Sequence, residues 1–190
     1  MRELIVLRHG ETDGNARKVA QGRTQLPLNE CGREQAAAAG RLIARLDWEP
    51  ERIVSSPLRR CVETTSIALS FLDATGTPLV PEYRDEFLEV DVGDAEGKPL
   101  SHLDFSTGFA AYGGESREQL FARVRGGLDS LDGDESILLV THGGVFKAIL
   151  SHLMGFQGQY WLGLRTGTCM RLERRDDRYS LTHFLHPSEL

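Results

Sequence analysis

Residues 4–12 read LIVLRHGET, an apolar run that leads directly into a cationic loop containing glycine. A short run of apolar and β-branched residues is typical of a buried strand, and open α/β sheets bind ligands at the carboxyl ends of such strands. Arg8 can bind an anionic oxygen with its planar guanidinium group. Gly10 allows a close backbone approach, and His9 can act as nucleophile or proton carrier. The segment therefore predicts a strand that ends at a phosphate site.

The same pattern returns later in the chain, where residues 137–144 read ILLVTHGG. The apolar run predicts another buried strand, and residues 145–154 predict a helix that stops at Gly155. His142 could be an ordinary core histidine, but the glycine pair at a strand-to-helix turn favours a ligand site. We therefore expect His9 and His142 at one pocket.

Between these two segments, helix and strand patterns alternate. Apolar residues at helical spacing predict a helix over residues 29–46, and Ile53 with Val54 predicts a second short strand. Ser56 followed by Pro57 is typical of a helix cap and first turn, which places Arg60 where free backbone N–H groups attract anions. The apolar residues that share one face of this helix are Leu58, Val62, Thr65, Leu69 and Leu72.

The remaining patterns complete an α/β chain. Leu79 and Val80 indicate a further strand, and residues 82–97 form an acidic loop without clear periodicity. Ser116 and Gln119 make a capping box for the next helix. Its inward-facing residues are Leu120, Val124, Leu128 and Leu131. Residues 169–173 and 179–185 flank a polar turn and predict a hairpin of edge strands.

The composition limits the class of protein. The chain has 190 residues, of which 40% are hydrophobic and 26% charged, and this predicts a single domain over residues 1–190. A net charge of -6 argues against a general nucleic-acid surface, although a local basic pocket can still bind a small phosphorylated ligand. The opening apolar segment is too short for a signal-peptide core, and no apolar run is long enough to span a bilayer. We expect a cytoplasmic protein with neither a nucleic-acid nor a membrane partner.

The three cysteines do not form a recognisable metal motif. Cys31, Cys61 and Cys169 lie far apart and follow no zinc-ligand spacing, so we expect them to be small buried hydrophobic residues. Cys61 follows two arginines, which leaves a thiol nucleophile as an alternative. No metal site is expected.

Taken together, the motifs resemble those of the histidine phosphatase superfamily, in its phosphoglycerate mutase-like group. The resemblance covers nearly the whole chain in the family's order, from the Arg-His-Gly motif to the later His-Gly-Gly. Its middle blocks are QG at residues 21–22, SSPLRR at 55–60, Glu89 with the Glu-Gly pair at 96–97, and GGES at 113–116. It implies an α/β three-layer sandwich in which helices flank a central, mainly parallel sheet.

The resemblance also implies a role for each site residue. His9 is the expected nucleophile, which forms a phosphohistidine, and Glu89 is the expected proton donor and later base. A phosphomonoester dianion resists attack until its charge is neutralised, and this is the expected role of Arg8, Arg60 and His142. Arg59 is the fallback for Arg60. The further expected phosphate contacts are Asn15, Gln21, Gly22 and Gly143, and no cofactor is implied.

Three functions are compatible with these motifs. The first is a metal-independent phosphatase acting on a small phosphorylated metabolite. The second is a phosphoglycerate-type mutase, but family mutases usually carry a longer insertion between the glutamate motif and the GGES block. The third is a non-catalytic phosphate-binding or regulatory domain, although every core position holds a chemically competent residue. Hydrolysis is favoured.

The sequence leaves the substrate and the oligomeric state open. Residues 97–112 are expected to roof the pocket, with Tyr160 and Trp161 nearby. Three aromatic residues there could stack on a substrate or simply pack in the core: Phe105, Phe109 and Tyr112. Ala95 and Val92 stand where the family commonly has aromatic residues, and Cys61 where it has alanine, so substrate analogies do not transfer. Edge strands near the C-terminus offer one route to a homodimer.

Overall fold

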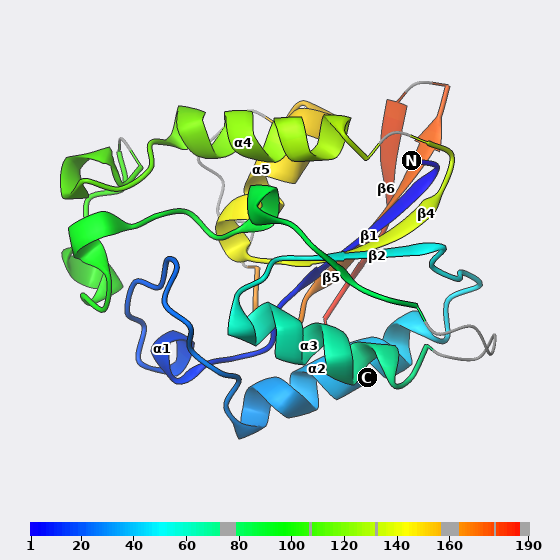
Figure 1. The fold of residues 1–190 in the computed structure, drawn as a ribbon, viewed down its shortest axis with the longest axis horizontal. Helices are drawn as coiled ribbons and strands as arrows, with labels where there is room; N and C mark the ends of the chain where they lie inside the picture. The colour runs from blue at the N-terminus through cyan, green and yellow to red at the C-terminus, as the bar shows by residue number, and fades with distance from the viewer. Residues whose placement is uncertain (73–78, 107, 132, 157–163, 177, 187–190) are drawn as a thin grey trace.

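The computed structural model describes residues 1–72, 79–106, 108–131, 133–156, 164–176 and 178–186. In these residues, six strands form one sheet in the order β3-β2-β4-β1-β5-β6 (Figure 1). The first four strands in the chain run parallel to one another, β5 pairs antiparallel with β1, and β6 pairs antiparallel with β5. The strands are β1 (Glu3–Arg8), β2 (Arg52–Ser55), β3 (Glu82–Tyr83), β4 (Ser136–Thr141), β5 (Cys169–Arg175) and β6 (Arg178–Leu185). The predicted mainly parallel sheet is confirmed.

Helices cover both faces of the sheet. In Figure 1, α2 (Glu30–Ile43) and α3 (Arg59–Leu69) lie against one face, and α4 (Arg117–Asp129) and α5 (Gly143–Met154) against the other. The short helix α1 (Asp13–Ala16) follows β1. Short 3₁₀ segments are η1 (Asp85–Phe87), η2 (Gly93–Ala95), η3 (Leu100–His102) and η4 (Ala110–Tyr112). This is the three-layer sandwich that the sequence predicted.

The central strand β1 contributes to two separate cores because successive side chains of a strand point to opposite faces. Leu4 and Val6 are buried in the cluster that contains the apolar residues of α4 and α5. Ile5 and Leu7 are buried in the cluster that contains those of α2 and α3. Strand β4 alternates in the same way. A strand that is covered on both faces needs an unbroken apolar run, which is why these two segments were so clear in the sequence.

Helix α3 differs from its prediction in both its start and its buried face. It begins at Arg59, and its N-cap residue, Leu58, makes no side-chain cap hydrogen bond. The predicted cap at Ser56 was wrong because the helix begins later: the Ser56 hydroxyl accepts only a long hydrogen bond, 3.4 Å, from the Leu58 N–H, and it lies 2.7 Å from Nε2 of His142 in a tertiary contact. The buried residues of the helix are Arg60, Cys61, Thr64, Thr65 and Ala68. The two threonine hydroxyls are satisfied inside the helix, since they donate to the carbonyls of Arg60 and Cys61.

The edges of the sheet also differ from the prediction. The third strand is Glu82–Tyr83 rather than a pair at Leu79 and Val80, and Val80 is 80% exposed. The supposed loop over 82–97 contains this strand, η1 and η2. β5 is not an edge strand, because it pairs with β1 on one side and β6 on the other. No helix within the described ranges is both long and apolar enough to cross a membrane.

Two glycines hold the loop after β1 against the first turn of α2. A Cβ on Gly10 would lie 2.1 Å from the Gly32 carbonyl oxygen, and one on Gly32 would lie 2.0 Å from the Glu11 carbonyl oxygen. These contacts are with backbone atoms, which cannot move away as a flexible side chain can. The absence of side chains at both positions therefore lets the loop lie directly on α2.

We expect Gly32→Ala to lower the free energy of unfolding by about 1–3 kcal/mol, the usual cost of overpacking. Gly126→Ala is the matched control, because Gly126 is also helical but its added Cβ would meet nothing within 4 Å. Its better helix propensity should raise stability by up to about 1 kcal/mol. Urea denaturation measures both. Equal stabilisation by the two substitutions would contradict the close approach.

Candidate active site

The two sequence-predicted histidines leave neighbouring strands at the same edge of the sheet. β1 and β4 pair in parallel with Arg8 opposite Thr141, so the next residue in each chain segment is a histidine. The His9 and His142 rings lie 5.2 Å apart between centroids, at an interplanar angle of 60°. Both side chains are buried. The structure thus brings together two imidazoles that are 133 residues apart in the sequence.

The His9 ring is fixed in one tautomer. Its Nδ1 lies 2.7 Å from the carbonyl oxygen of Gly10, and because a carbonyl only accepts, Nδ1 carries the proton and donates it. This leaves the Nε2 lone pair free for attack. Burial lowers the pKa of His9 well below 6.5, and the positive charges of Arg60 and Arg8 lower it further. The imidazole is therefore neutral and nucleophilic at neutral pH.

His142 is held in the opposite tautomer. Nε of Arg60 donates to its Nδ1 at 3.2 Å, so the ring proton is on Nε2, which donates to the Ser56 hydroxyl at 2.7 Å. The thiol of Cys61 lies 3.4 Å from the same Nε2. Burial lowers the pKa of His142 well below 6.5, and Arg60 contributes to that shift. His142 is thus a neutral hydrogen-bond donor.

Two buried arginines flank the histidines. Arg60 is only 1% exposed, and besides His142 it donates to the carbonyl oxygens of Gly22 at 2.8 Å and Thr24 at 2.9 Å. Arg8 donates to the Leu164 carbonyl, while its Nε is buried and lacks a hydrogen-bond partner in the part of the chain that the structure describes. Burial lowers the pKa of Arg8. A guanidinium with an unsatisfied buried donor is suited to an anionic oxygen.

Arg60, rather than its neighbour Arg59, belongs to the site. Arg59 is exposed, and its Nε pairs with Glu63 at 2.8 Å, one turn further along the same helix. The fallback is therefore not supported. The Cys61 alternative also fails, because burial raises the pKa of its thiol to about 12 and so keeps it protonated at neutral pH. Cys169 is buried as expected, but Cys31 is exposed, which corrects that part of the cysteine prediction.

Glu89 reaches the site from the segment between η1 and η2. Its Oε1 accepts hydrogen bonds from the backbone N–H groups of Gly144, at 3.1 Å, and Val90, at 3.0 Å. Gly144 is in the first turn of α5, so the carboxylate lies at the positive end of that helix. A Cβ on Gly144 would lie 2.4 Å from this oxygen, and one on Gly143 would lie 3.3 Å from Cζ of Arg8. The glycine pair therefore makes room for both functional groups.

The predicted loop contacts lie beside the site but have structural partners. Asn15 and Thr12 form the capping box of α1, and the Thr12 hydroxyl also donates to Oε1 of Gln21 at 2.8 Å. Nε2 of Gln21 is buried with no hydrogen-bond partner among the described residues. The Gly22 N–H donates to the Glu96 carboxylate at 3.0 Å. These residues shape the loop beside Arg60, and their contacts with phosphate remain a prediction.

The aromatic residues of the predicted roof pack with one another. Phe109 and Tyr112 pack against a small cluster of Ala20, Val92 and Ala95, and Phe105 lies 5.6 Å from Phe109 between ring centroids. Small residues at 92 and 95 leave space for these rings. Tyr160 and Trp161 lie outside the described residues.

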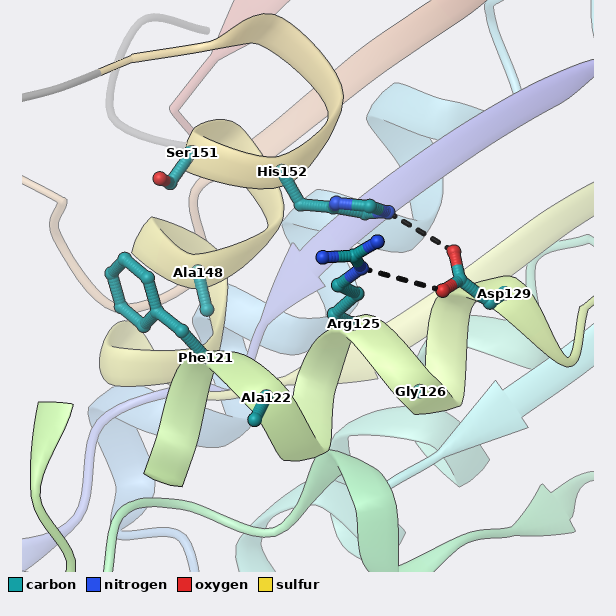
Figure 2. A pocket seen from close by; sticks show the side chains of 8 residues that line it. All are labelled: Phe121, Ala122, Arg125, Gly126, Asp129, Ala148, Ser151 and His152. Atoms are coloured by element: carbon teal, nitrogen blue, oxygen red, sulfur yellow. Dashed lines mark hydrogen bonds and ion pairs between the residues drawn. The ribbon is translucent and has the colours of Figure 1, made fainter. Parts of the chain in front are cut away.

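A separate groove of about 600 Å³ lies between α4 and α5 (Figure 2). Figure 2 shows His152 directed at Asp129, with Nε2 3.2 Å from Oδ1, while Ser151 points elsewhere. The groove is lined by Phe121, Ala122, Arg125, Gly126, Asp129, Ala148, Ser151 and His152. None of the predicted site residues is in this set, so His152 is a surface histidine, as the sequence indicated.

Three residues that lie near the site were not predicted from the sequence. Ser56 is the hydrogen-bond partner of His142, and it lies within a motif that the sequence already marked. Lys147, on α5, has its pKa lowered to about 8 by burial, an effect that the nearby Glu89 charge opposes. Arg123, on α4, donates to the backbone around Glu89. No local pattern signals the last two, because their positions depend on tertiary packing.

Comparison with known proteins agrees with this geometry. Residues 4–185 match the model of the histidine phosphatase superfamily (branch 1). The chain is 35% identical to the "uncharacterized phosphatase PhoE" of Bacillus subtilis, over 82% of this chain and 79% of that protein. It is 32% identical to the glucosyl-3-phosphoglycerate phosphatase of Mycolicibacterium vanbaalenii, over 85% of this chain and 78% of that protein.

A solved structure supports the fold independently. The phosphoglycerate mutase of Bacillus anthracis superposes with a TM-score of 0.82 at 23% identity, over 98% of this chain and 94% of that one. The fold is therefore the phosphoglycerate mutase-like α/β fold. Hydrolysis of phosphate monoesters is the activity that the family model and the named relatives support. The chain belongs to the histidine phosphatase superfamily, in its branch 1.

Proposed function

We propose that residues 1–190 act as a single-domain, metal-independent phosphomonoesterase whose nucleophile is His9. The observation that carries this proposal is the tautomer of His9. The Nδ1 proton is donated to the Gly10 carbonyl, so the Nε2 lone pair is available, and the charges of two buried arginines act on the ring. A neutral imidazole held in this way is a competent nucleophile toward phosphorus.

The first half-reaction transfers the phosphoryl group to His9. Nε2 of His9 bonds to phosphorus as the ester P–O bond breaks, and the non-bridging oxygens are bound by Arg8, Arg60 and His142. The Nε2–H of His142 exchanges its hydrogen bond to the Ser56 hydroxyl for one to the phosphate. The loop groups of Asn15, Gln21, Gly22 and Gly143 complete the proposed phosphate contacts. Because the guanidinium groups are buried, they interact with the dianion more strongly than they would in water.

Glu89 is the proposed general acid and, in the second half-reaction, the general base. The leaving oxygen takes its proton from the Glu89 carboxyl group as the P–O bond breaks. Water then attacks phosphorus, the N–P bond breaks, and Glu89 takes a proton from that water, which restores both residues. The hydrogen bond from the Gly144 N–H stabilises the carboxylate between these two steps.

The proposed substrate class is a small phosphorylated metabolite in the cytoplasm. One relative is named for glucosyl-3-phosphoglycerate, an ester of this class, and the net charge of -6 disfavours a nucleic-acid partner. Among the described residues, no group of three His, Cys, Asp or Glu side chains is arranged to hold a metal ion. Activity in EDTA tests metal independence directly.

We expect His9→Ala to lower phosphate release by at least about 10³-fold, because removal of a nucleophile eliminates the covalent route. The measurement is inorganic phosphate released from a panel of phosphomonoesters in EDTA. His152→Ala is the control, since that histidine lies in the separate groove. Phosphoryl transfer that requires bisphosphoglycerate and releases no phosphate would instead indicate a mutase.

We expect Glu89→Gln to discriminate between leaving groups. Hydrolysis of an alkyl phosphate such as β-glycerol phosphate should fall by about 10²–10⁴-fold, because the alkoxide needs a proton. Hydrolysis of p-nitrophenyl phosphate should fall far less, since nitrophenolate leaves without protonation. Steady-state kcat/KM values for the two esters test this, because kcat/KM reports the steps up to phosphoryl transfer to His9 and excludes the later step in which Glu89 acts as the base. Equal losses in kcat/KM would assign Glu89 to the shape of the site rather than to acid catalysis.

We expect the imidazole of His9 to remain neutral at pH values where a free histidine is charged. Burial and the two arginines lower its pKa, so its titration midpoint moves to the acid side of 6.5. An NMR titration across pH 5–8, the range over which unperturbed histidines change charge, measures this. The His9→Ala spectrum assigns the signal. A midpoint at or above 6.5 would contradict the neutral nucleophile.

A further inference from the structure

The segment that carries Glu89 has little regular structure of its own. Between η1 and η2, residues 88–92 belong to no described helix or strand. The Glu89 carboxylate accepts hydrogen bonds from Gly144 and Val90, but these contacts do not fix the backbone before residue 89. The position of the proposed proton donor must therefore depend on contacts from another element.

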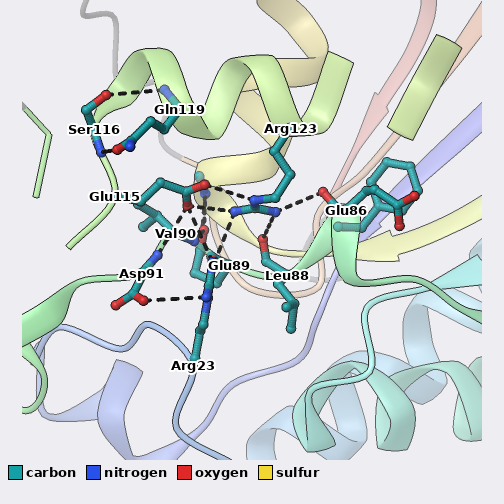
Figure 3. Close-up of polar contacts among 12 residues, drawn as sticks. Arg23, Glu86, Leu88, Glu89, Val90, Asp91, Glu115, Ser116, Gln119 and Arg123 are labelled. Atoms are coloured by element: carbon teal, nitrogen blue, oxygen red, sulfur yellow. Dashed lines mark hydrogen bonds and ion pairs between the residues drawn. The ribbon is translucent and has the colours of Figure 1, made fainter. Parts of the chain in front are cut away.

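Arg123 of α4 provides those contacts. Its Nη1 donates to the carbonyl oxygens of Glu86 at 2.9 Å and Leu88 at 3.0 Å, and more distantly to that of Asp85 at 3.5 Å. Its Nη2 lies 3.5 Å from the carbonyl oxygen of Glu89 itself. In Figure 3, the guanidinium group lies between α4 and this backbone. One side chain therefore contacts four of the five carbonyls over residues 85–89, and the fifth, that of Phe87, accepts from the Thr141 hydroxyl at 3.0 Å.

The guanidinium group is itself held in place by Glu115. Its Nε and Nη2 contact the two carboxylate oxygens of Glu115 at 2.9 and 2.7 Å, a bidentate arrangement that restricts rotation of the Arg123 side chain. The Arg123 side chain is 20% exposed and that of Glu115 is 10% exposed, so water competes weakly for the pair. A partly exposed Arg23 lies 3.9 Å from the same carboxylate.

Glu115 also holds the chain on the other side of Glu89. Its Oε2 accepts from the Asp91 N–H at 3.3 Å, and its own N–H donates to the Asp91 carbonyl at 2.8 Å (Figure 3). Arg123 thus holds the carbonyls of residues 85, 86, 88 and 89, and Glu115 holds residue 91. The general acid lies between the two anchors.

We propose that Arg123, oriented by Glu115, is a positioning residue that fixes Glu89 relative to the phosphate held by His9. This inference rests on the proposed function. Its chemical requirement is the planar fork of arginine, which can contact a carboxylate through one edge and backbone carbonyls through the other. Lysine keeps the charge but has a single nitrogen, so it cannot make both sets of contacts. The role therefore concerns geometry more than charge.

The test compares Arg123→Lys with wild type on β-glycerol phosphate and p-nitrophenyl phosphate. A displaced acid should lower kcat/KM on the alkyl phosphate by about 10–100-fold, because a misplacement of about 1 Å can cost 10²-fold. The kcat/KM on p-nitrophenyl phosphate, whose leaving group needs no proton, should change by less than about threefold, since kcat/KM does not include the later hydrolysis of the phosphohistidine. Arg125→Lys is the matched control, since Arg125 is on the same helix but its side chain is 67% exposed.

Glu115→Gln is a second variant, which weakens the bidentate contact that orients the Arg123 guanidinium group. It should produce the same selective loss on the alkyl phosphate, and combining it with Arg123→Lys should add little further loss, because both act through one contact. Thermal unfolding of each variant reports any general effect on the fold. The selective loss should also resemble that of Glu89→Gln in direction and be smaller in size.

The outcomes separate this inference from the proposed function. A parallel fall on both esters, accompanied by lower thermal stability, would assign Arg123 to the fold alone and overturn the positioning role. Unchanged kcat/KM values on both esters would overturn it as well. In either case, wild-type turnover that is lost in His9→Ala would leave the proposed function standing. Wild-type protein that hydrolyses neither ester would remove both proposals.

Discussion

The parallel pairing of β1 with β4 is the constraint on which the site depends. Parallel strands place their carboxyl ends at one edge of a sheet, and the observed register sets Arg8 opposite Thr141. Because of that register, His9 and His142 follow at the same level. A shift of the register by one residue would turn the apolar side chains of one strand to the opposite faces, which both cores forbid. Core packing therefore determines the distance between the two imidazoles.

Electrostatics explain why such a site favours a dianion. Arg8 and Arg60 are two buried positive charges whose hydrogen-bond partners are backbone carbonyls and one imidazole nitrogen, and the Glu89 carboxylate near Arg8 offsets only part of their charge. The two histidines add no negative charge because burial and the arginines keep them neutral. A phosphate group supplies the missing counter-charge in a medium of low dielectric, where each hydrogen bond to it is strong. Burial and, second to it, the charges of the two arginines lower the pKa of His9, the proposed nucleophile.

The sequence predicted what local patterns determine. The two buried strands, helix α2 and the capping box of α4 follow from apolar spacing and cap residues, and each was found. The choice of Arg60 over Arg59 followed from the family motif. The cap at Ser56 was mispredicted because its hydroxyl has a partner 86 residues away in the sequence, which no local rule can reveal.

Other features were missed for the same reason. The β3 strand has only two residues, both exposed, so it carries no hydrophobic periodicity. The hydrogen bonds of Arg123 reach backbone carbonyls 34 to 38 residues earlier in the chain, and backbone acceptors leave no signature in the side-chain sequence. From the sequence alone, an arginine on a helix face is most simply interpreted as a solvent-exposed residue. Only the packing of α4 against η1 identifies this one as a contact.

An N–H group at the N-terminus of α5 faces a carboxylate of the protein itself. A helix N-terminus commonly binds phosphate directly, but here the Gly144 N–H donates to the Glu89 carboxylate. The second residue of the helix therefore faces the proposed acid, whereas Gly143 before it is among the proposed phosphate contacts, beside the guanidinium groups. In the proposed mechanism, the Gly144 hydrogen bond stabilises the carboxylate that remains after proton donation, and that carboxylate is the base for the hydrolytic water. The glycine pair at 143–144 is thus as much a part of the proposed mechanism as the ionisable side chains, because any Cβ there would displace Arg8 or Glu89.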